Sequence, residues 1–173
     1  MYLKNPDVDI KIWGNAYEYD NERPEAISNI MEYYYNNGLH FMVTALYNQF
    51  TSRICFDITN EQSKYKVFLD YSKFHNIHYY NSISGYYSGD FLSAYEACKY
   101  LLLHDTNTLY MENAISNLKF YSEQFKQDVY NEPLLQFFIG YLNNAQKPLH
   151  IKTQIWDLSK ELIKTKMTSE EKK

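Results

Sequence analysis

The chain of 173 residues carries a net charge of −4, and 45% of its residues are hydrophobic and 22% charged. This length fits a single domain, and the composition excludes a fibrous repeat or wholesale disorder. No apolar run approaches the roughly 20 residues that a membrane helix requires. Pro6, Asp7 and Asp9 stand where a secretory signal would carry its apolar core, which predicts a cytoplasmic protein. We expect one domain over residues 1–167 and a frayed tail over 168–173.

Charge is distributed unevenly along the chain. The net charge is −5 over Met1–Ser63, −2 over Lys64–Gln146 and +3 over Lys147–Lys173. A duplex-binding groove needs clustered Lys and Arg, so direct binding of nucleic acid is not expected. The acidic first third instead favours a basic partner.

The first expected elements are a strand and a helix. Residues 9–20 alternate in part, with Ile10 and Ile12 on one side and Gly14 as a bulge, which predicts a strand. A helix is predicted to begin near Pro24, because the apolar residues that follow recur at helical spacing. Asn36, Asn37 and Gly38 predict its end, since Gly adopts the left-handed conformation of a helix C-terminus.

A second helix is predicted over Leu39–Phe50, followed by a change to an alternating pattern. The segments Arg53–Ile58 and Tyr65–Tyr71 predict an antiparallel hairpin within Arg53–Phe74, and Asn76–Tyr80 predicts a third strand. From Asp90 onward the pattern is helical. Pro133 and Pro148 separate a strongly apolar helix over Leu134–Leu142 from a last amphipathic helix. The expected fold class is therefore α+β, with a small antiparallel sheet from the first half packed against a helical bundle from the second.

Motifs of catalysis are missing from the sequence. Five glycines form no phosphate-binding loop, and no hydrolase or zinc-protease motif occurs. His75 and His78 would point to opposite sides of the predicted strand, which argues against a shared metal. Cys55 and Cys98 are predicted to be buried thiols. We expect no catalytic residue, no metal and no cofactor.

One enzyme hypothesis stays open as an alternative. Asp57 and Asp70 lie on the predicted hairpin with Lys73, which is the set of groups that a magnesium-dependent nuclease uses. Tyr71 and Ser72 separate the second acid from the lysine, where the usual nuclease pattern has a single residue. Solvated strand charges explain the same residues without any catalysis.

The clearest candidate site interleaves acidic residues with tyrosine. Acidic groups steer a basic partner, and tyrosines anchor it after contact. A solvated acidic face is the alternative, and coding bias is another source of the 19 tyrosines. The predicted partner-binding residues are Glu18, Asp20, Glu22, Glu25, Glu32, Tyr17, Tyr19, Tyr33 and Tyr35.

These features favour a small protein-binding module that inhibits or neutralises a basic protein, such as a nuclease toxin or a nucleic-acid-handling factor. Immunity proteins and phage inhibitors of host defence are similar in composition, although no family motif is present. A structural subunit is the other alternative. Its almost wholly apolar helix over Leu134–Leu142 would then lie in a homo-oligomer interface.

Overall fold

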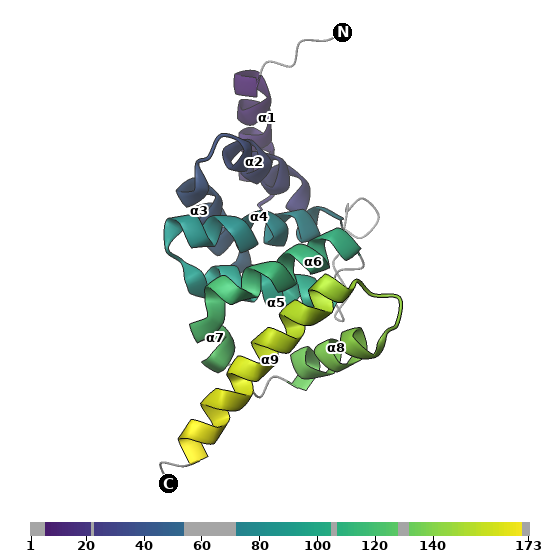
Figure 1. Cartoon of the computed structure of the whole chain (residues 1–173). Helices are drawn as coiled ribbons and strands as arrows, with labels where there is room; N and C mark the ends of the chain where they lie inside the picture. Colours follow the sequence, from purple (N-terminus) through teal and green to yellow (C-terminus); the bar gives the residue numbers. More distant parts are fainter. Residues whose placement is uncertain (1–5, 22, 54–71, 105–106, 128–131, 171–173) are drawn as a thin grey trace.

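The computed structural model describes residues 6–21, 23–53, 72–104, 107–127 and 132–170. All regular structure within these ranges is helical (Figure 1). The elements are α1 (Pro6–Tyr19), α2 (Pro24–Asn36), α3 (His40–Thr51), α4 (Ser72–Ser88), α5 (Phe91–His104), α6 (Thr108–Asn117), the 3-10 helix η3 (Leu118–Tyr121), α7 (Ser122–Gln127), α8 (Glu132–Asn143) and α9 (Leu149–Glu170). The described fold is a helical bundle, and the expectation of an α+β fold with an antiparallel sheet is wrong.

Two of the predicted strands are helices. The segment 9–20 falls mostly in α1, where Ile10, Trp13 and Tyr17 recur at helical spacing and Tyr17 packs against the neighbouring core. The segment Asn76–Tyr80 lies in α4. Most of the predicted hairpin, residues 54–71, lies outside the described residues, and Ser72–Phe74 begin α4.

The expected break between α2 and α3 is confirmed. Gly38 has φ +70°, its amide donates to the carbonyl of Tyr35 at 3.0 Å, and the amide of Leu39 donates to the carbonyl of Tyr34 at 2.9 Å. This pair of bonds is the Schellman motif, in which a left-handed residue satisfies the last carbonyls of a helix. The chain therefore turns sharply from α2 into α3.

Buried apolar residues form two clusters that meet at α4 and α5. One cluster joins α2, α3 and α4, with Ile27, Met31 and Phe50 wholly buried. The other joins α5 to the helices that follow it, with Leu101 and Ile155 at its centre. Figure 1 shows α4 and α5 across the middle of the molecule, with α1 and α2 at one end and α9 reaching toward the other.

Helix α4 is central although it lacks a clear apolar stripe. Asn81, Ser82 and Ser84 are buried in it, and their small side chains let neighbouring helices approach. The buried hydroxyl of Tyr121 donates to the carbonyl of Ser82 at 2.6 Å, and Asn81 donates to the hydroxyl of Ser93 at 3.2 Å. Hydrogen bonds therefore supplement apolar packing in this part of the core.

The apolar helix α8 packs against α5 and α9. Leu134, Phe138 and Tyr141 are buried there, whereas Ile139 is 51% exposed. None of the described helices combines the length and the apolar character needed to cross a membrane.

Candidate functional site

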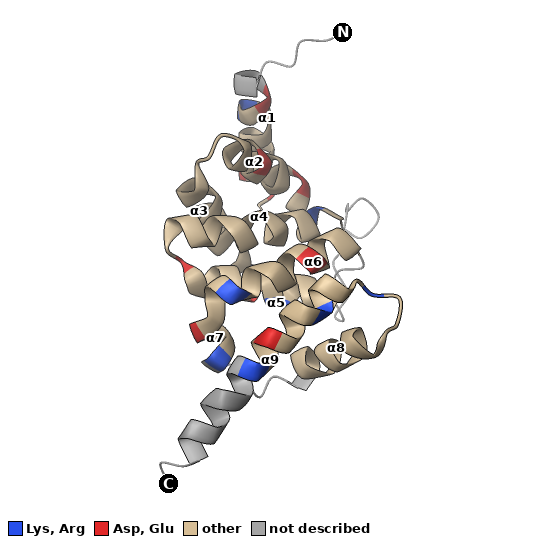
Figure 2. Ribbon diagram, viewed as in Figure 1, with Lys and Arg blue, Asp and Glu red and all other residues tan. Residues whose placement is uncertain are grey.

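Eight of the nine predicted partner-binding residues lie on α1 and α2 or directly after α1. Residues 1–36 contain seven acidic and three basic residues, a net charge of −4. Figure 2 shows several acidic positions on α1 and α2, and others on α6, α7 and α9. Tyr17, Glu18, Tyr19 and Asp20 come from α1 and its end, Glu25, Glu32, Tyr33 and Tyr35 come from α2, and Glu22 lies outside the described residues.

A groove of about 440 Å³ between α1 and α2 brings part of this set together. Its walls contain Tyr19, Asp20 and Glu25 of the predicted site, and also Trp13 and Ala26. Trp13 and Asp20 are seven residues apart on or beside α1, and therefore lie on the same side of the helix. Tyr19 is 94% exposed, so nearly its whole ring faces solvent beside the groove.

Arg23 gives the groove a fixed internal ion pair. Its Nη2 and Nε donate to the two carboxylate oxygens of Glu25 at 3.0 and 3.3 Å. The hydrogen bond to Glu25 and the negative charge of that group raise the pKa of Arg23. The carboxylate of Glu25 is thus engaged within the chain, while Glu18 and Glu32 are exposed.

Tyr17 and Tyr35 face the interior more than the groove. Tyr17 packs against the α2–α3–α4 cluster, and burial raises the pKa of its hydroxyl, against an opposing effect of Arg53. The ring of Tyr35 lies 5.2 Å from that of Tyr80 and 5.8 Å from that of His40. Tyr33 is half-buried, and its ring contacts that of Tyr34. The structure therefore favours Tyr19 over Tyr33 and Tyr35 as an anchor for a partner.

His75 and His78 lie three residues apart on α4, so the prediction of opposite sides of a strand is wrong. His78 is buried and stacks on Tyr100 with a centroid distance of 3.6 Å, and its Nδ1 lies 3.0 Å from the hydroxyl of Tyr47. Among the described residues, no three side chains of His, Cys, Asp or Glu are grouped to hold a metal ion.

The residues of the nuclease alternative are only partly within the described ranges. Asp57 and Asp70 lie outside them, as does Cys55. Lys73 donates to the side-chain oxygen of Asn29 on α2 at 3.3 Å. Cys98 is buried as predicted, and burial raises the pKa of its thiol.

A second hollow, of about 630 Å³, lies beside α3 and α5, and polar side chains line it. Asn48 donates to Asp90 at 2.7 Å, and the amide of Ser93 donates to the same carboxylate at 3.1 Å. Burial raises the pKa of Asp90, but the hydrogen bonds from Asn48 and Ser93 outweigh burial and lower it overall. Lys99 pairs with Glu96 at 2.9 Å. The hydrogen bond between Asn48 and Asp90 holds the N-terminus of α5 against α3, and the pair of Lys99 and Glu96 lies within α5.

A surface that the sequence analysis missed joins the ends of α3, α4, α5 and η3. We call it the aromatic edge and define it by its exposed rings, which are Phe41, Tyr86, Tyr87, Phe91 and Phe120. These residues come from three separate stretches of sequence, residue 41, residues 86–91 and residue 120, so no local pattern predicts that the three stretches meet. Phe41 and Tyr87 are 73% and 66% exposed.

Comparisons with protein-family models, with curated proteins and with solved structures find no match for this chain.

Proposed function

We propose that this protein binds a basic segment of a partner protein in the groove between α1 and α2, and thereby neutralises that partner as an immunity-type inhibitor does. The observation that carries the proposal is the exposed ring of Tyr19 beside Trp13 and Asp20 in one acidic groove. A Lys or Arg side chain is attracted both to carboxylates and to the faces of aromatic rings.

The charge of this end supports the same partner at longer range. A net charge of −4 over the first 36 residues attracts a basic protein before contact and accelerates the encounter. Proteins that act on nucleic acids expose Lys and Arg for phosphate contacts. A basic segment on a nuclease toxin or a nucleic-acid-handling factor would fit this groove. While it is bound there, its Lys and Arg side chains could not contact the phosphates of a nucleic acid.

The partner must first be captured from extract of the native cell on the wild-type protein, identified and purified. Trp156→Phe then leaves Trp13 as the single tryptophan, because the chain has only two. Trp156 is exposed on α9, so its replacement should not disturb the fold. Binding should change the fluorescence of Trp13, and binding without such a change places the partner elsewhere.

The first prediction concerns the association rate. Glu18→Lys combined with Glu32→Lys should slow association roughly tenfold at low ionic strength, because both carboxylates are exposed at the acidic end. The difference should shrink in high salt, where charges are screened. Reversal of Glu25 is less informative, since it would also break the ion pair with Arg23. Stopped-flow measurements at two salt concentrations provide the test.

The matched control is Glu96→Lys combined with Glu123→Lys, which changes the net charge equally on α5 and α7. Both control residues form exposed ion pairs with a lysine three residues away, and pairs of this kind contribute little to stability. An equal slowing by both double variants would mean that only net charge matters, and would contradict docking at the groove.

The second prediction concerns the lifetime of the complex. Tyr19→Ala should raise the dissociation rate roughly 30-fold, corresponding to a loss on the order of 2 kcal/mol at an interface hot spot. The unfolding midpoint should not change, since the ring is 94% exposed in the free protein. Trp156→Ala removes an exposed ring far along the chain and serves as the control. A Tyr19→Ala complex that dissociates at the wild-type rate would exclude this ring as the anchor.

A further inference from the structure

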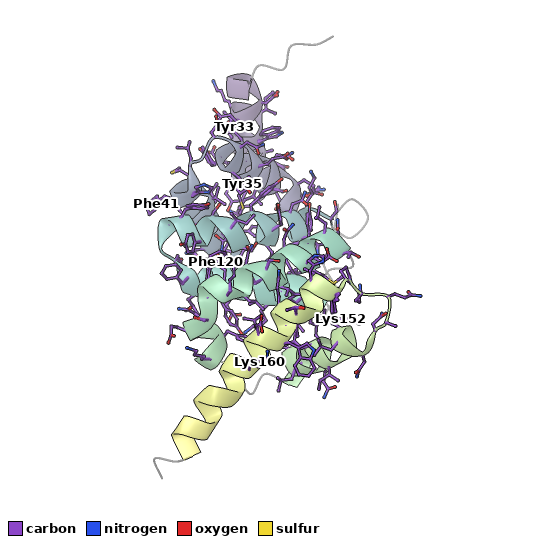
Figure 3. The ribbon with its side chains drawn as sticks, viewed as in Figure 1. Tyr33, Tyr35, Phe41, Phe120, Lys152 and Lys160 are labelled. Atoms are coloured by element: carbon purple, nitrogen blue, oxygen red, sulfur yellow. The ribbon has the colours of Figure 1, made fainter. Side chains whose placement is uncertain are left out.

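Four of the five rings of the aromatic edge are connected through Tyr86, and Phe41 follows His40, which stacks on Tyr87. The ring of Tyr86 lies 5.5 Å from that of Tyr87, 5.0 Å from that of Phe120 and 6.0 Å from that of Phe91. Tyr87 in turn stacks on His40 at 4.5 Å. Figure 3 shows Phe41 projecting from α3 on the same side of the view as Phe120. Exposed apolar rings that contact one another in this way are characteristic of an interface.

The helices behind this surface lack charge over long stretches. Residues 33–52 and 74–89 contain no Asp, Glu, Lys or Arg. Figure 2 accordingly shows α3 and almost all of α4 without charged positions, in contrast to the acidic end at α1 and α2. Depletion of charge together with enrichment in Tyr, Phe and Met is the composition of an interface core. Leu39, which directly precedes α3, and Met42 within it are both exposed and extend the apolar character of this side.

Side-chain hydrogen bonds hold the surface in place. Nδ1 of His40 lies 3.0 Å from the hydroxyl of Ser84, and the hydroxyl of Thr44 lies 2.9 Å from that of Ser88. These contacts fix α3 on α4. The rings therefore extend from packed helices and lose little further freedom when they are covered, which favours a specific complex.

The absence of charge also restricts the occupant. A partner that brought Asp or Glu to this surface would lose the hydration of those groups without gaining a counter-charge, and a partner Lys or Arg would compete with Lys119, which already lies over the ring of Phe120. The matching occupant is itself uncharged and aromatic, and the same surface of a second chain has this chemistry. In a two-fold pair each residue near the axis faces its own copy, so an uncharged centre avoids repulsion between like charges.

The rim of the surface is consistent with self-association. Asp90 precedes Phe91 at one border, and Nζ of Lys119 lies 4.8 Å from the ring centroid of Phe120 at another. A rim with one carboxylate and one ammonium is complementary to a second copy of itself. We propose that two copies of this protein form a symmetric dimer through the aromatic edge, with the acidic grooves outside the interface.

Sedimentation velocity over a range of concentrations tests this proposal. The wild-type protein should sediment as a dimer at high concentration, with an affinity that changes little with salt. Phe41→Glu should raise the dimer dissociation constant roughly 100-fold, because the new carboxylate would be desolvated opposite its own copy. Phe41 is 73% exposed, so the variant should keep the circular dichroism spectrum and the unfolding midpoint of the wild type.

Ile139→Glu is the matched control, since it places the same charge on an exposed residue of α8. It also tests the alternative interface over Leu134–Leu142. Retention of the dimer in Ile139→Glu and its loss in Phe41→Glu support the proposal. A wild-type monomer at all concentrations, or a dimer broken only by Ile139→Glu, would overturn it.

A photo-reactive benzoylphenylalanine at position 41 adds a second readout that does not depend on loss of function. Cross-links between two copies should map to the aromatic edge, and cross-links confined to other surfaces would contradict the arrangement. The Glu18→Lys and Glu32→Lys variant should dimerise normally. A result that contradicts the dimer can therefore be distinguished from a result that contradicts binding of a partner in the acidic groove.

Discussion

His78 shows how strongly position within the fold determines the chemistry of one side chain. Its imidazole stacks on Tyr100, and Tyr47, His75 and His104 lie around it. Burial lowers the pKa of His78 well below its usual value, and repulsion from His75 and His104 lowers it further. The folded protein therefore keeps this ring neutral at pH values where the unfolded chain protonates it.

This difference predicts a loss of stability in mild acid. Below about pH 6.5 the unfolded state binds a proton that the folded state does not, so the free energy of unfolding falls as pH decreases. The slope for one such group approaches about 1.4 kcal/mol per pH unit. Urea denaturation between pH 5 and 7.5 should show this slope in the wild type.

Two variants, His78→Gln and His150→Gln, separate the contribution of His78 to the pH dependence of stability from the contributions of other groups. The first should be less stable at pH 7 but flatter in its dependence on pH, because the buried titrating group is gone. The second alters an exposed residue of α9 and should leave the slope unchanged. An unchanged slope in His78→Gln would assign the acid sensitivity to other groups. Asp90 has a lowered pKa and contributes only at lower pH, near and below about 4.

At the scale of elements, α4 and α5 approach each other at Gly85. A Cβ at this position would lie 2.5 Å from the Cβ of Ala94 and 2.8 Å from the carbonyl oxygen of Asp90. Neither atom belongs to a flexible side chain, so the two helices would have to separate. By contrast, a Cβ at Gly140 of α8 would meet no heavy atom within 4 Å.

These two glycines predict opposite effects of the same substitution. Gly85→Ala should lower the free energy of unfolding by about 1–3 kcal/mol, as overpacking of a core does. Gly140→Ala should raise it by about 0.5–1 kcal/mol, because Ala restricts the unfolded chain and favours a helix. Urea denaturation of both variants gives the comparison. Stabilisation of similar size at both positions would show that α4 and α5 do not pack this closely.

Helix α4 also shows why part of the fold could not be predicted from sequence. Tyrosines, histidines and small polar side chains make up most of it and give no apolar stripe of helical period, and its tyrosines and isoleucines favour strands by propensity. Packing against α3 and α5 determines its conformation, and that information is not local. In α1 the pair Ile10 and Ile12 suggested alternation, although Trp13 and Tyr17 continue a helical period.

At the scale of the whole molecule, local signals predicted the helices after Asp90 and the break at Gly38, since Pro and Gly have strong backbone preferences. The acidic end was predictable because its residues are close in sequence. The place of Tyr19 in a groove with Trp13 was not, since it depends on how α1 crosses α2. The aromatic edge was invisible in the sequence because Phe41, Tyr87 and Phe120 are brought together only by the fold.

Two long stretches without lysine or arginine have a practical consequence for chemical labelling and proteolysis. Residues 24–52 and 74–98 contain no Lys or Arg, so trypsin has no cleavage site there and amine-reactive reagents have no lysine to modify. The same stretches offer no acceptor for acetylation or ubiquitination of lysine. Cross-linking through lysine would therefore not sample these stretches, and it would report the aromatic edge through Lys119, whose Nζ lies beside the ring of Phe120.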